Sequence, residues 1–306
     1  MSNLHEIKRR IASATSTKQI TRTMEMVSTA KIRRALDRAQ EAAPYKDAIT
    51  LMLANVSEAG AGGEEPLLRK PASVRCALLI VIASDRGLAG GFNMSLQRAA
   101  EQMKKDLEAT GVKVLLVTCG RKPTEYFRYR GVTPTLSFAG ISSEPTMEEA
   151  DQIASYLIDG FSKETIDRCV IFYQHARNRV EQDEVIEQLL PVDSSALKLP
   201  TGPRTHEAVE AVGTAPAGGS QFEFDPSASK VLGYLMPAYV RTVIYHALLD
   251  SAAAEHGARR RAMQSATENA TEVITTLNRT YNRLRQSSIT TELNEIVGGA
   301  SALEDM

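Results

Sequence analysis

The stretch SDRGLAGGFN, residues 84–93, is the first part of this sequence where chemistry could be expected. It follows the apolar run VRCALLIVIA, which has the composition of a buried strand, and a glycine-rich turn after a strand often holds a phosphate group. Gly90-Gly91 is not followed by Lys-Ser or Lys-Thr, and the glycines lack the GxGxxG spacing. We therefore expect a structural strand-to-helix turn, in which glycine supplies positive φ or close backbone approach. A phosphate site is the alternative interpretation.

The other reactive residue types do not form a recognisable site. The sequence has no HExxH motif, no Cys/His cluster, no CxxC pair and no GxSxG motif. Each cysteine lies in or beside an apolar run, which is typical of buried side chains in a reducing compartment. These patterns predict no metal, no cofactor and no catalytic residue. The residues concerned are His5, His175, His206, His246, His256, Cys76, Cys119 and Cys169.

Composition narrows the class of protein. The 306 residues are 43% apolar and 24% charged, as in an ordinary soluble protein. Aromatic residues make up 5% and Trp is absent, which favours long helices over a pocketed enzyme. The net charge of -1 argues against general nucleic-acid binding. The sequence has neither an apolar stretch long enough for a membrane span nor a signal peptide at its start.

A first helical segment is predicted over residues 1–58, which contain no glycine and a single proline. Its early apolar residues have the spacing of a coiled-coil seam, and the stripe is then expected to shift twice along the helix. A continuous helix of this length would measure roughly 80 Å. The three stripes are Leu4, Ile7, Ile11 and Ala14; Ile20, Met24 and Val27; and Ile32, Leu36, Ala39 and Ala43.

Residues 74–192 alternate between strand-like and helical patterns, which predicts a Rossmann-like α/β domain with parallel strands. Residues 193–222 are rich in Ser, Thr, Pro, Gly and Ala and are expected to form an inserted exposed loop. The expected strands cover 74–83, 112–119 and 168–174, with an edge strand at 185–192, and the expected helices cover 93–110 and 146–163.

A second long helix is predicted within residues 225–306, with Asp225 as N-cap, Pro226 at the first helical position and a kink or break at Pro237. Neither long helix can bury its stripe against the central domain along its whole length. We therefore expect the two to pair as an antiparallel coiled coil. The expected stripe is Val273, Leu277, Thr280, Leu284, Ser287 and Thr291, followed by Ile289, Leu293, Ile296, Ala300 and Leu303 on a shifted face.

The first helix is basic, with nine Lys or Arg against three acidic residues over positions 1–40. This charge fits a DNA-binding region, a solvated helix face, or a shaft inside an acidic or polar collar. DNA binding is disfavoured because the whole chain is nearly neutral and the seam begins at Leu4, inside the basic stretch.

The end of the sequence, ITTELNEIVGGASA at 289–302, closely resembles the C-terminal signature of the γ subunit of F-type ATP synthases. YNRLRQSSIT at 281–290 is similar to the family text just upstream, and residues 6–35 resemble the N-terminal helix of the family. SDRGLAGGFN resembles a third family block in the central domain. The residues that match the C-terminal signature are Ile289, Thr290, Glu292, Glu295, Gly299 and Ala300.

The resemblance implies a rotor shaft rather than an enzyme. Its coiled coil is expected in the bore of an α3β3 ring, with the α/β domain on the ring of c subunits beside the ε subunit. The shaft would couple ion-driven c-ring rotation to ATP synthesis in the β subunits. It would carry no cofactor and bind no nucleic acid. It would lie peripherally at the cytoplasmic face of the cell membrane, held there through the complex.

By the same resemblance, Met24 is expected near the β-subunit lever, and Arg285, Gln286 and Thr290 are expected to make polar contacts with the collar. Phe222 and Glu223 align loosely with the foot that faces the c-ring. Many family members are shorter at 193–222, where this chain could form either a hairpin that limits backward rotation or a passive loop. The competing interpretations are a nucleotide-binding α/β enzyme with helical oligomerisation arms and a static coiled-coil scaffold.

Overall fold

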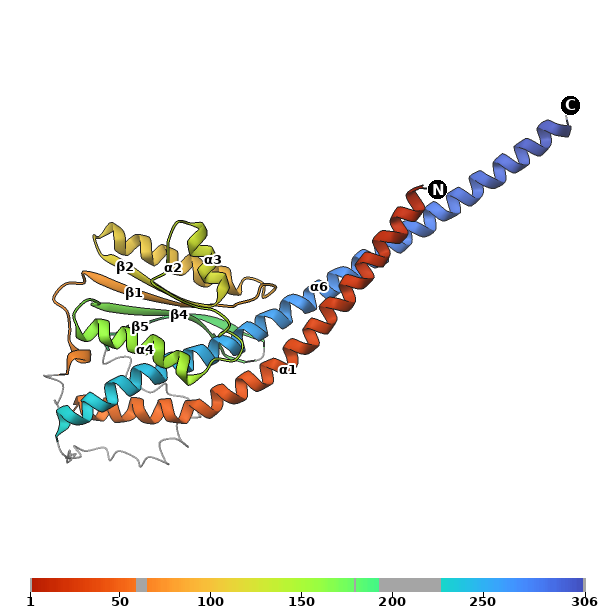
Figure 1. Ribbon diagram of the computed structural model, residues 1–306. Coiled ribbons are helices and arrows are strands. Elements are labelled where there is room, and N and C mark those ends of the chain that lie inside the picture. Colours follow the sequence, from red (N-terminus) through yellow and green to blue (C-terminus); the bar gives the residue numbers. More distant parts are fainter. Residues whose placement is uncertain (1, 59–64, 179, 193–226, 305–306) are drawn as a thin grey trace. The chain divides into compact units, whose positions relative to one another are not determined.

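The computed structural model describes residues 2–58, 65–178, 180–192 and 227–304. Contacts divide the chain into two compact units. The stalk unit comprises Met1–Ser28 and Arg260–Met306, and the sheet unit comprises Thr29–Arg259. Two long helices, α1 (Ser2–Glu58) and α6 (Ala228–Glu304), contribute a segment to each unit (Figure 1).

The sheet unit contains a five-stranded sheet in the order β3-β2-β1-β4-β5. The first four strands in this order are parallel, as predicted, and β5 pairs antiparallel with β4 at the edge. The short strand β3 was not predicted, because three residues give no readable alternation. The strands are β1 (Cys76–Ile82), β2 (Lys113–Cys119), β3 (Leu136–Phe138), β4 (Arg168–Ala176) and β5 (Gln182–Leu190).

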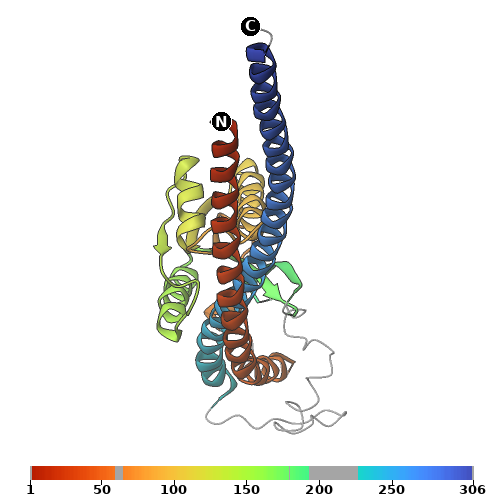
Figure 2. The same ribbon diagram turned by 90° about the vertical axis from the view of Figure 1, so that its right-hand side faces the viewer.

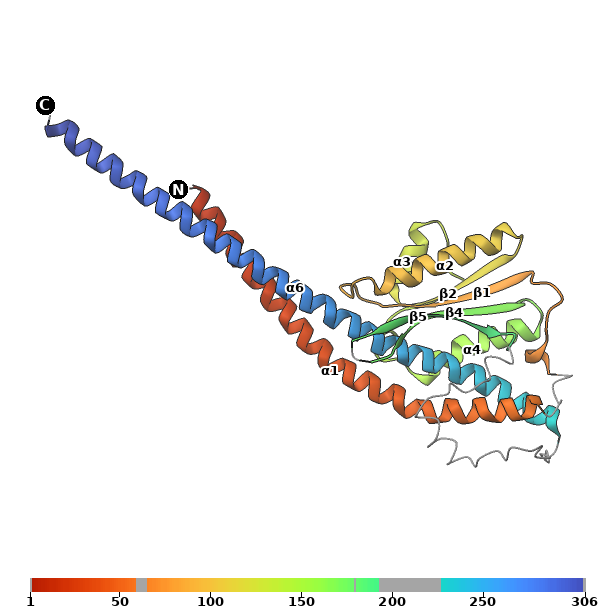
Figure 3. The same ribbon diagram turned by 180° about the vertical axis from the view of Figure 1, so that it is seen from behind.

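Helices cover both faces of this sheet. The helices α2 (Phe92–Ala109) and α3 (Arg121–Tyr129) lie on one face (Figure 1). The other face is covered by α4 (Met147–Ser162) and the first part of α6, as the view from behind shows (Figure 3). A short 3-10 helix, η1 (Pro66–Leu68), precedes β1. The predicted α/β class is confirmed, and the nine-residue α3 is the helix that the sequence pattern missed.

Strand β1 explains why this sheet has two hydrophobic cores. Leu78 and Ile80 face the core formed with α4 and α6, whereas Leu79 and Val81 face the core formed with α2. All seven residues of β1 are buried. Because successive side chains of a strand point to opposite faces, a strand covered on both sides must be apolar throughout.

The first part of α6 lies inside the sheet unit. Every residue from 247 to 259 is buried, and alanines at 252–254 and 258 let neighbouring elements approach closely. Of the predicted kink or break at Pro237, the break is wrong, because α6 continues through this residue. Leu232 and Met236 are fully buried in the core, so tertiary packing holds the helix despite the missing N–H. Asp225 lies outside the described residues, and Ser227 Oγ accepts from the Lys230 N–H at this helix end.

In the stalk unit, the start of α1 runs antiparallel to the later part of α6, as two perpendicular views show (Figures 1 and 2). The hydroxyls of Thr21 and Thr267 form a buried hydrogen bond of 2.7 Å across the pair. This confirms the predicted antiparallel two-helix coil for the stalk unit.

Candidate functional site

The glycine-rich turn is held by the chain's own groups. Asn93 accepts the Ser84 N–H at 2.9 Å and the Ser84 hydroxyl at 2.8 Å. Leu88 and Gly90 have φ of 63° and 60°, the left-handed conformation expected in such a turn. The geometry therefore agrees with the predicted structural turn.

The carboxylate of Asp85 lies just after β1, at the carboxyl ends of β1 and β2. It accepts backbone N–H groups from Gly140 at 2.8 Å, Arg121 at 3.0 Å and Ser142 at 3.1 Å. Burial raises the pKa of Asp85, but the hydrogen bonds from Gly140 and Ser142 outweigh it, so that the pKa lies below its usual range. In nucleotide-binding α/β folds the ligand lies where the strand order reverses, which in this sheet is between β1 and β4. At the end of β1, an internal carboxylate takes backbone N–H groups that could otherwise bind a phosphate.

Helix α6 closes the turn with a buried ion pair. Arg259 Nη2 donates to Glu255 Oε1 at 2.7 Å and to the carbonyls of Arg86 at 3.3 Å and Gly87 at 3.4 Å. Burial raises the pKa of Glu255, and the charge of Arg259 and its hydrogen bond oppose that rise. This pair therefore fixes the turn to α6, and we did not predict it from the sequence. The sequence pattern that could have predicted this pair is two charged residues of opposite sign, four positions apart, within an alanine-rich buried stretch.

The described residues contain no group of three or more His, Cys, Asp or Glu placed to hold a metal ion. Over the same residues, no helix combines the length and the apolar composition needed to cross a membrane.

The coil of the stalk unit has a partly polar seam. The predicted seam at Leu4, Ile7, Ile11 and Ala14 is confirmed, since all four are buried or half-buried. The predicted shift to Ile20, Met24 and Val27 is wrong. The same heptad spacing continues instead through polar residues, because spacing and not side-chain type decides which residues face the partner helix. These polar seam residues are Lys18, Thr21, Glu25 and Ser28.

The apolar residues that the seam leaves out form an exposed face on α1, which we call the α1 outer face: Ile20, Met24 and Val27. Ile20 is 57% exposed and Val27 51% exposed. Met24 is half-buried and lines a hollow of about 280 Å³ with Gln19, Ile20 and Thr23. Because these residues recur at i, i+4 and i+7, they lie on one side of the helix. In the stalk unit this side is open to a partner.

On α6, Leu277 and Leu284 are half-buried in the seam, as predicted, whereas Val273 is 50% exposed. Ser287 and Thr291 were also predicted to lie in the seam, and this is wrong because both residues are exposed. The seam of α6 follows 263, 267, 270, 274, 277, 281, 284 and 288.

The predicted contact residues on α6 lie outside this seam. Arg285, Gln286 and Thr290 are exposed, and the Thr290 hydroxyl donates to the Gln286 carbonyl at 2.9 Å. The structure does not bring them near Met24. From the Thr21–Thr267 pair, the antiparallel register places Met24 opposite about residue 264, which is about 30 Å from Arg285 along the helix.

The end of α6 continues past the end of α1. The same register places Ser2, the first residue of α1, opposite about residue 286. Beyond that point α6 is a single helix in the stalk unit (Figure 2). Its apolar side chains are exposed by 48% to 68%, and Ile289, Leu293 and Ile296 among them were predicted to belong to a shifted stripe. We call them the α6 apex: Ile289, Leu293, Ile296 and Val297.

Three expectations from the sequence lie outside the described residues. These are Phe222 and Glu223 as foot residues and the inserted loop at 193–222.

The family is decided by similarity along the whole chain. The model of the ATP synthase family matches residues 3–303. The ATP synthase gamma chain of Leptospira biflexa is 35% identical over 303 residues, covering 99% of this chain and 100% of the relative.

This chain belongs to the ATP synthase γ chain family.

Solved structures share the γ chain fold at lower identity. One chain is from the cryo-EM structure of Euglena gracilis mitochondrial ATP synthase, OSCP/F1/c-ring, rotational state 3. It has a TM-score of 0.65 and 18% identity, with 99% of this chain and 95% of that chain covered. Another is from the structure of the same enzyme titled rotor, rotational state 1. It has a TM-score of 0.61 and 16% identity, with 94% and 99% of the two chains covered.

Membership of the γ chain family gives the exposed apolar residues a consistent explanation. Large exposed apolar faces mark interaction surfaces. Periodicity assigned Ile20, Met24 and Val27 to the seam and Ile289, Leu293 and Ile296 to a shifted stripe, whereas the family resemblance predicted Met24 as a contact residue. The signal available was the heptad count from Leu4, which already excludes Ile20, Met24 and Val27.

Proposed function

We propose that this chain is the central rotor shaft of an F-type ATP synthase, without a catalytic site of its own. It would turn with the c-ring and change the conformations of three β subunits in sequence. Three identical subunits can differ at one moment only if something asymmetric lies among them. A two-helix coil with different outer faces provides that asymmetry.

The observation that carries this proposal is the α6 apex. A single helix with Ile289, Leu293, Ile296 and Val297 between 48% and 68% exposed has apolar area that this chain leaves in contact with water. A surrounding collar of α and β subunits would cover that area. A smooth apolar contact suits a turning shaft, because non-directional burial does not fix one angle as a hydrogen-bond network would.

The α1 outer face is proposed to meet the β-subunit lever. Moving a two-state equilibrium from 1:99 to 99:1 requires about 5.5 kcal/mol of differential contact energy. Met24 is adaptable in shape, and Ile20 and Val27 beside it add apolar area. Small hydroxyl residues such as Thr23 surround them and form contacts that exchange readily. Arg285, Gln286 and Thr290 are proposed to add polar contacts with the collar.

The remaining partners and the location follow from the rotor role. We propose contacts with the c-ring and the ε subunit, with Phe222 and Glu223 at the c-ring foot, and a peripheral position at the cytoplasmic face of the cell membrane. The Euglena structure whose title names F1 and the c-ring supports the c-ring as a partner.

Removal of apolar area from the α6 apex tests the main proposal. We expect Ile289→Ser with Leu293→Ser to leave the unfolding of the isolated chain unchanged within about 0.5 kcal/mol, because both side chains are about half exposed. The ATP hydrolysis rate of the complex reconstituted with α and β subunits is expected to fall several-fold. Tyr129→Ser, at a 92% exposed residue on α3, is the matched control and should leave that rate unchanged.

The outcome that would count against the apex as a contact is an equal rate of ATP hydrolysis for the wild-type and apex variants in an assembled complex.

The polar contacts are tested separately by Gln286→Ala, with exposed Arg128→Ala on α3 as control. Equilibrium binding of ATP to the isolated chain tests the enzyme alternative. Because Asp85 already accepts the backbone N–H groups beside the glycine-rich turn, we expect no stoichiometric site there.

A further inference from the structure

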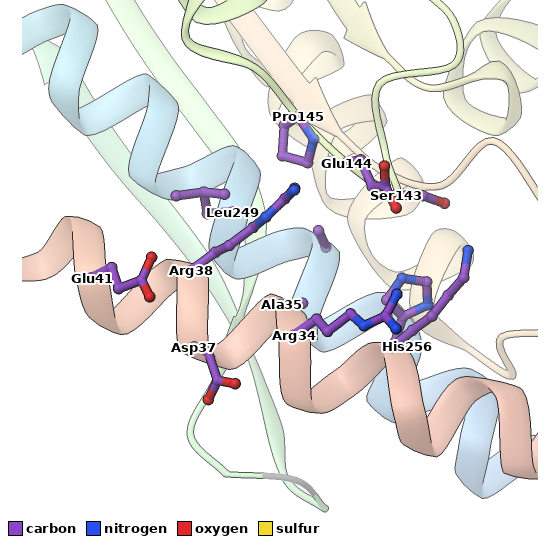
Figure 4. A pocket seen from close by; sticks show the side chains of 12 residues that line it. Arg34, Ala35, Asp37, Arg38, Glu41, Ser143, Glu144, Pro145, Leu249 and His256 are labelled. Atoms are coloured by element: carbon purple, nitrogen blue, oxygen red, sulfur yellow. The ribbon is translucent and has the colours of Figure 1, made fainter.

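A hollow of about 360 Å³ opens within the sheet unit, apart from the stalk surfaces. It lies between α1, the buried part of α6 and the segment before α4 (Figure 4). The residues that matter for its chemistry are Lys31, Arg34 and Arg38 on α1, Ser143 before α4 and His256 on α6.

The cations of this hollow have no anionic partner. Lys31, Arg34 and Arg38 recur at i, i+3 and i+7, so they lie on one side of α1. Within the described part of the chain, none of them forms a hydrogen bond or an ion pair. Three like charges this close repel one another, and a bound anion would remove that repulsion.

The acidic neighbours equal the three cations in number but form no ion pair with them in the described part of the chain. Asp37, Glu41 and Glu144 border the hollow, but in the described residues none of them forms an ion pair with its cations. Figure 4 shows Asp37 directed away from the hollow, whereas Arg38 extends toward Pro145. The two arginines are therefore available to a ligand from outside the chain.

The wall opposite α1 is held in place before any ligand arrives. Ser142 donates its N–H to Asp85 at 3.1 Å, and its hydroxyl accepts the Asp85 N–H at 3.0 Å. On the other side, Thr146 and Glu149 form a capping box that satisfies the start of α4. The helix N-terminus is thus already occupied, and the hollow depends on side-chain cations with the Ser143 hydroxyl nearby.

His256 adds shape and polarity rather than charge. Burial, with the charges of Arg259 and Lys31, lowers the pKa of His256 to about 4. The imidazole is therefore neutral near pH 7, and the positive charge of the hollow belongs to Lys31, Arg34 and Arg38.

We propose that this hollow binds a small multivalent oxyanion of the phosphate class, held by Arg34 and Arg38 with Lys31 as a third cation. Guanidinium groups bind phosphate oxygens in a planar, two-pronged geometry, and lysine supplies a point charge. Among the described residues no Phe, Tyr or Trp lines the hollow, and the His256 imidazole is its one aromatic ring, so it offers little stacking surface for a nucleotide base. The ligand is accordingly a free oxyanion, and the site does not depend on the proposed rotor role.

Calorimetric titration of the full-length chain with inorganic phosphate tests the proposal, at constant ionic strength set with chloride. We expect one saturable site. Arg34→Gln and Arg38→Gln should each weaken binding about 10-fold or more, since each removes a charge-assisted hydrogen-bonding group. The matched control is Arg33→Gln, an exposed arginine of the same helix that does not line the hollow, and it should leave the affinity unchanged.

Circular dichroism of each variant establishes that it is folded. If a glutamine variant fails to fold, Arg38→Lys keeps the charge and loses the planar fork, so its phosphate affinity should fall several-fold. The proposal is overturned by the absence of saturable phosphate binding, or by an equal loss in Arg33→Gln. Tighter binding of ADP than of pyrophosphate would overturn the free oxyanion as ligand. Tighter binding of a hexaglutamate peptide than of pyrophosphate would instead make the hollow a docking site for protein.

Discussion

Replacing Arg259 by methionine removes the cation that joins α6 to the glycine-rich turn. The side chains of Arg259 and Glu255 are 8% and 1% exposed. Removing one partner of a buried ion pair costs about 3–5 kcal/mol, because the other charge is left uncompensated. The hydrogen bonds from Arg259 to the carbonyls of Arg86 and Gly87 are long, so we expect their removal to cause no further loss of stability.

The stability lost in Arg259→Met depends on pH, and the burial of Glu255 determines the direction of that dependence. Burial already raises the pKa of Glu255, and Arg259 opposes that rise. Without Arg259 the folded-state pKa rises further above the unfolded value. The carboxyl is then protonated at low pH, and the cost of keeping it buried appears as pH rises. We therefore expect Arg259→Met to lose about 3 kcal/mol near pH 8 and less near pH 5.

Urea unfolding followed by circular dichroism measures this loss in a double-mutant cycle with Glu255→Gln. The double variant should lose less than the sum of the single variants, with a coupling of about 2 kcal/mol. Lys104→Met, which breaks a more exposed i,i+4 pair of 2.6 Å, is the control and should cost about 0.5 kcal/mol or less. A loss below about 1 kcal/mol for Arg259→Met, or fully additive losses, would refute the reasoning.

Two further predictions concern His175 and Gly120. The hydrogen bond to Asp250 is the largest cause that raises the pKa of His175, so its stabilisation is complete below the unfolded pKa and is lost as pH rises through the folded one. His175→Gln should therefore lower the urea midpoint more at pH 6 than at pH 9, and an equal shift would contradict this. Gly120 has φ of 108°, and a Cβ there would lie 2.4 Å from the Ala83 carbonyl oxygen. Gly120→Ala should cost about 2 kcal/mol or more of stability. Gly91→Ala, where a Cβ would have nothing within 4 Å, should cost about 0.5 kcal/mol or less. Equal decreases in the thermal unfolding midpoint of the two variants would contradict the clash at Gly120.

The fold was predictable where one physical signal dominated. Strand β1 is buried on both faces, and this gave a continuous apolar run. Helix α1 contains no glycine to interrupt it. Strand β3 and helix α3 were missed, because three and nine residues are too short for periodicity to stand out. Pro237 was misread because core packing overrides a local preference.

The surfaces were predictable only in part. Side-chain type along α1 assigns Ile20 to the seam, whereas the heptad spacing selects Thr21. The contact between Arg259 and Gly87 could not be predicted, because 172 positions separate them in the sequence. Periodicity describes one element at a time, and contacts between distant elements become apparent only in the folded chain.

Rotation within the assembled complex is the most direct test of the proposed function. A particle attached through Tyr129→Cys, at a 92% exposed position, would report the motion of this chain in a single α3β3 complex fixed by its α or β subunits. During ATP hydrolysis we expect the particle to turn continuously in one direction. If complexes that hydrolyse ATP leave the particle stationary, or fluctuating without net direction, this chain is not the shaft.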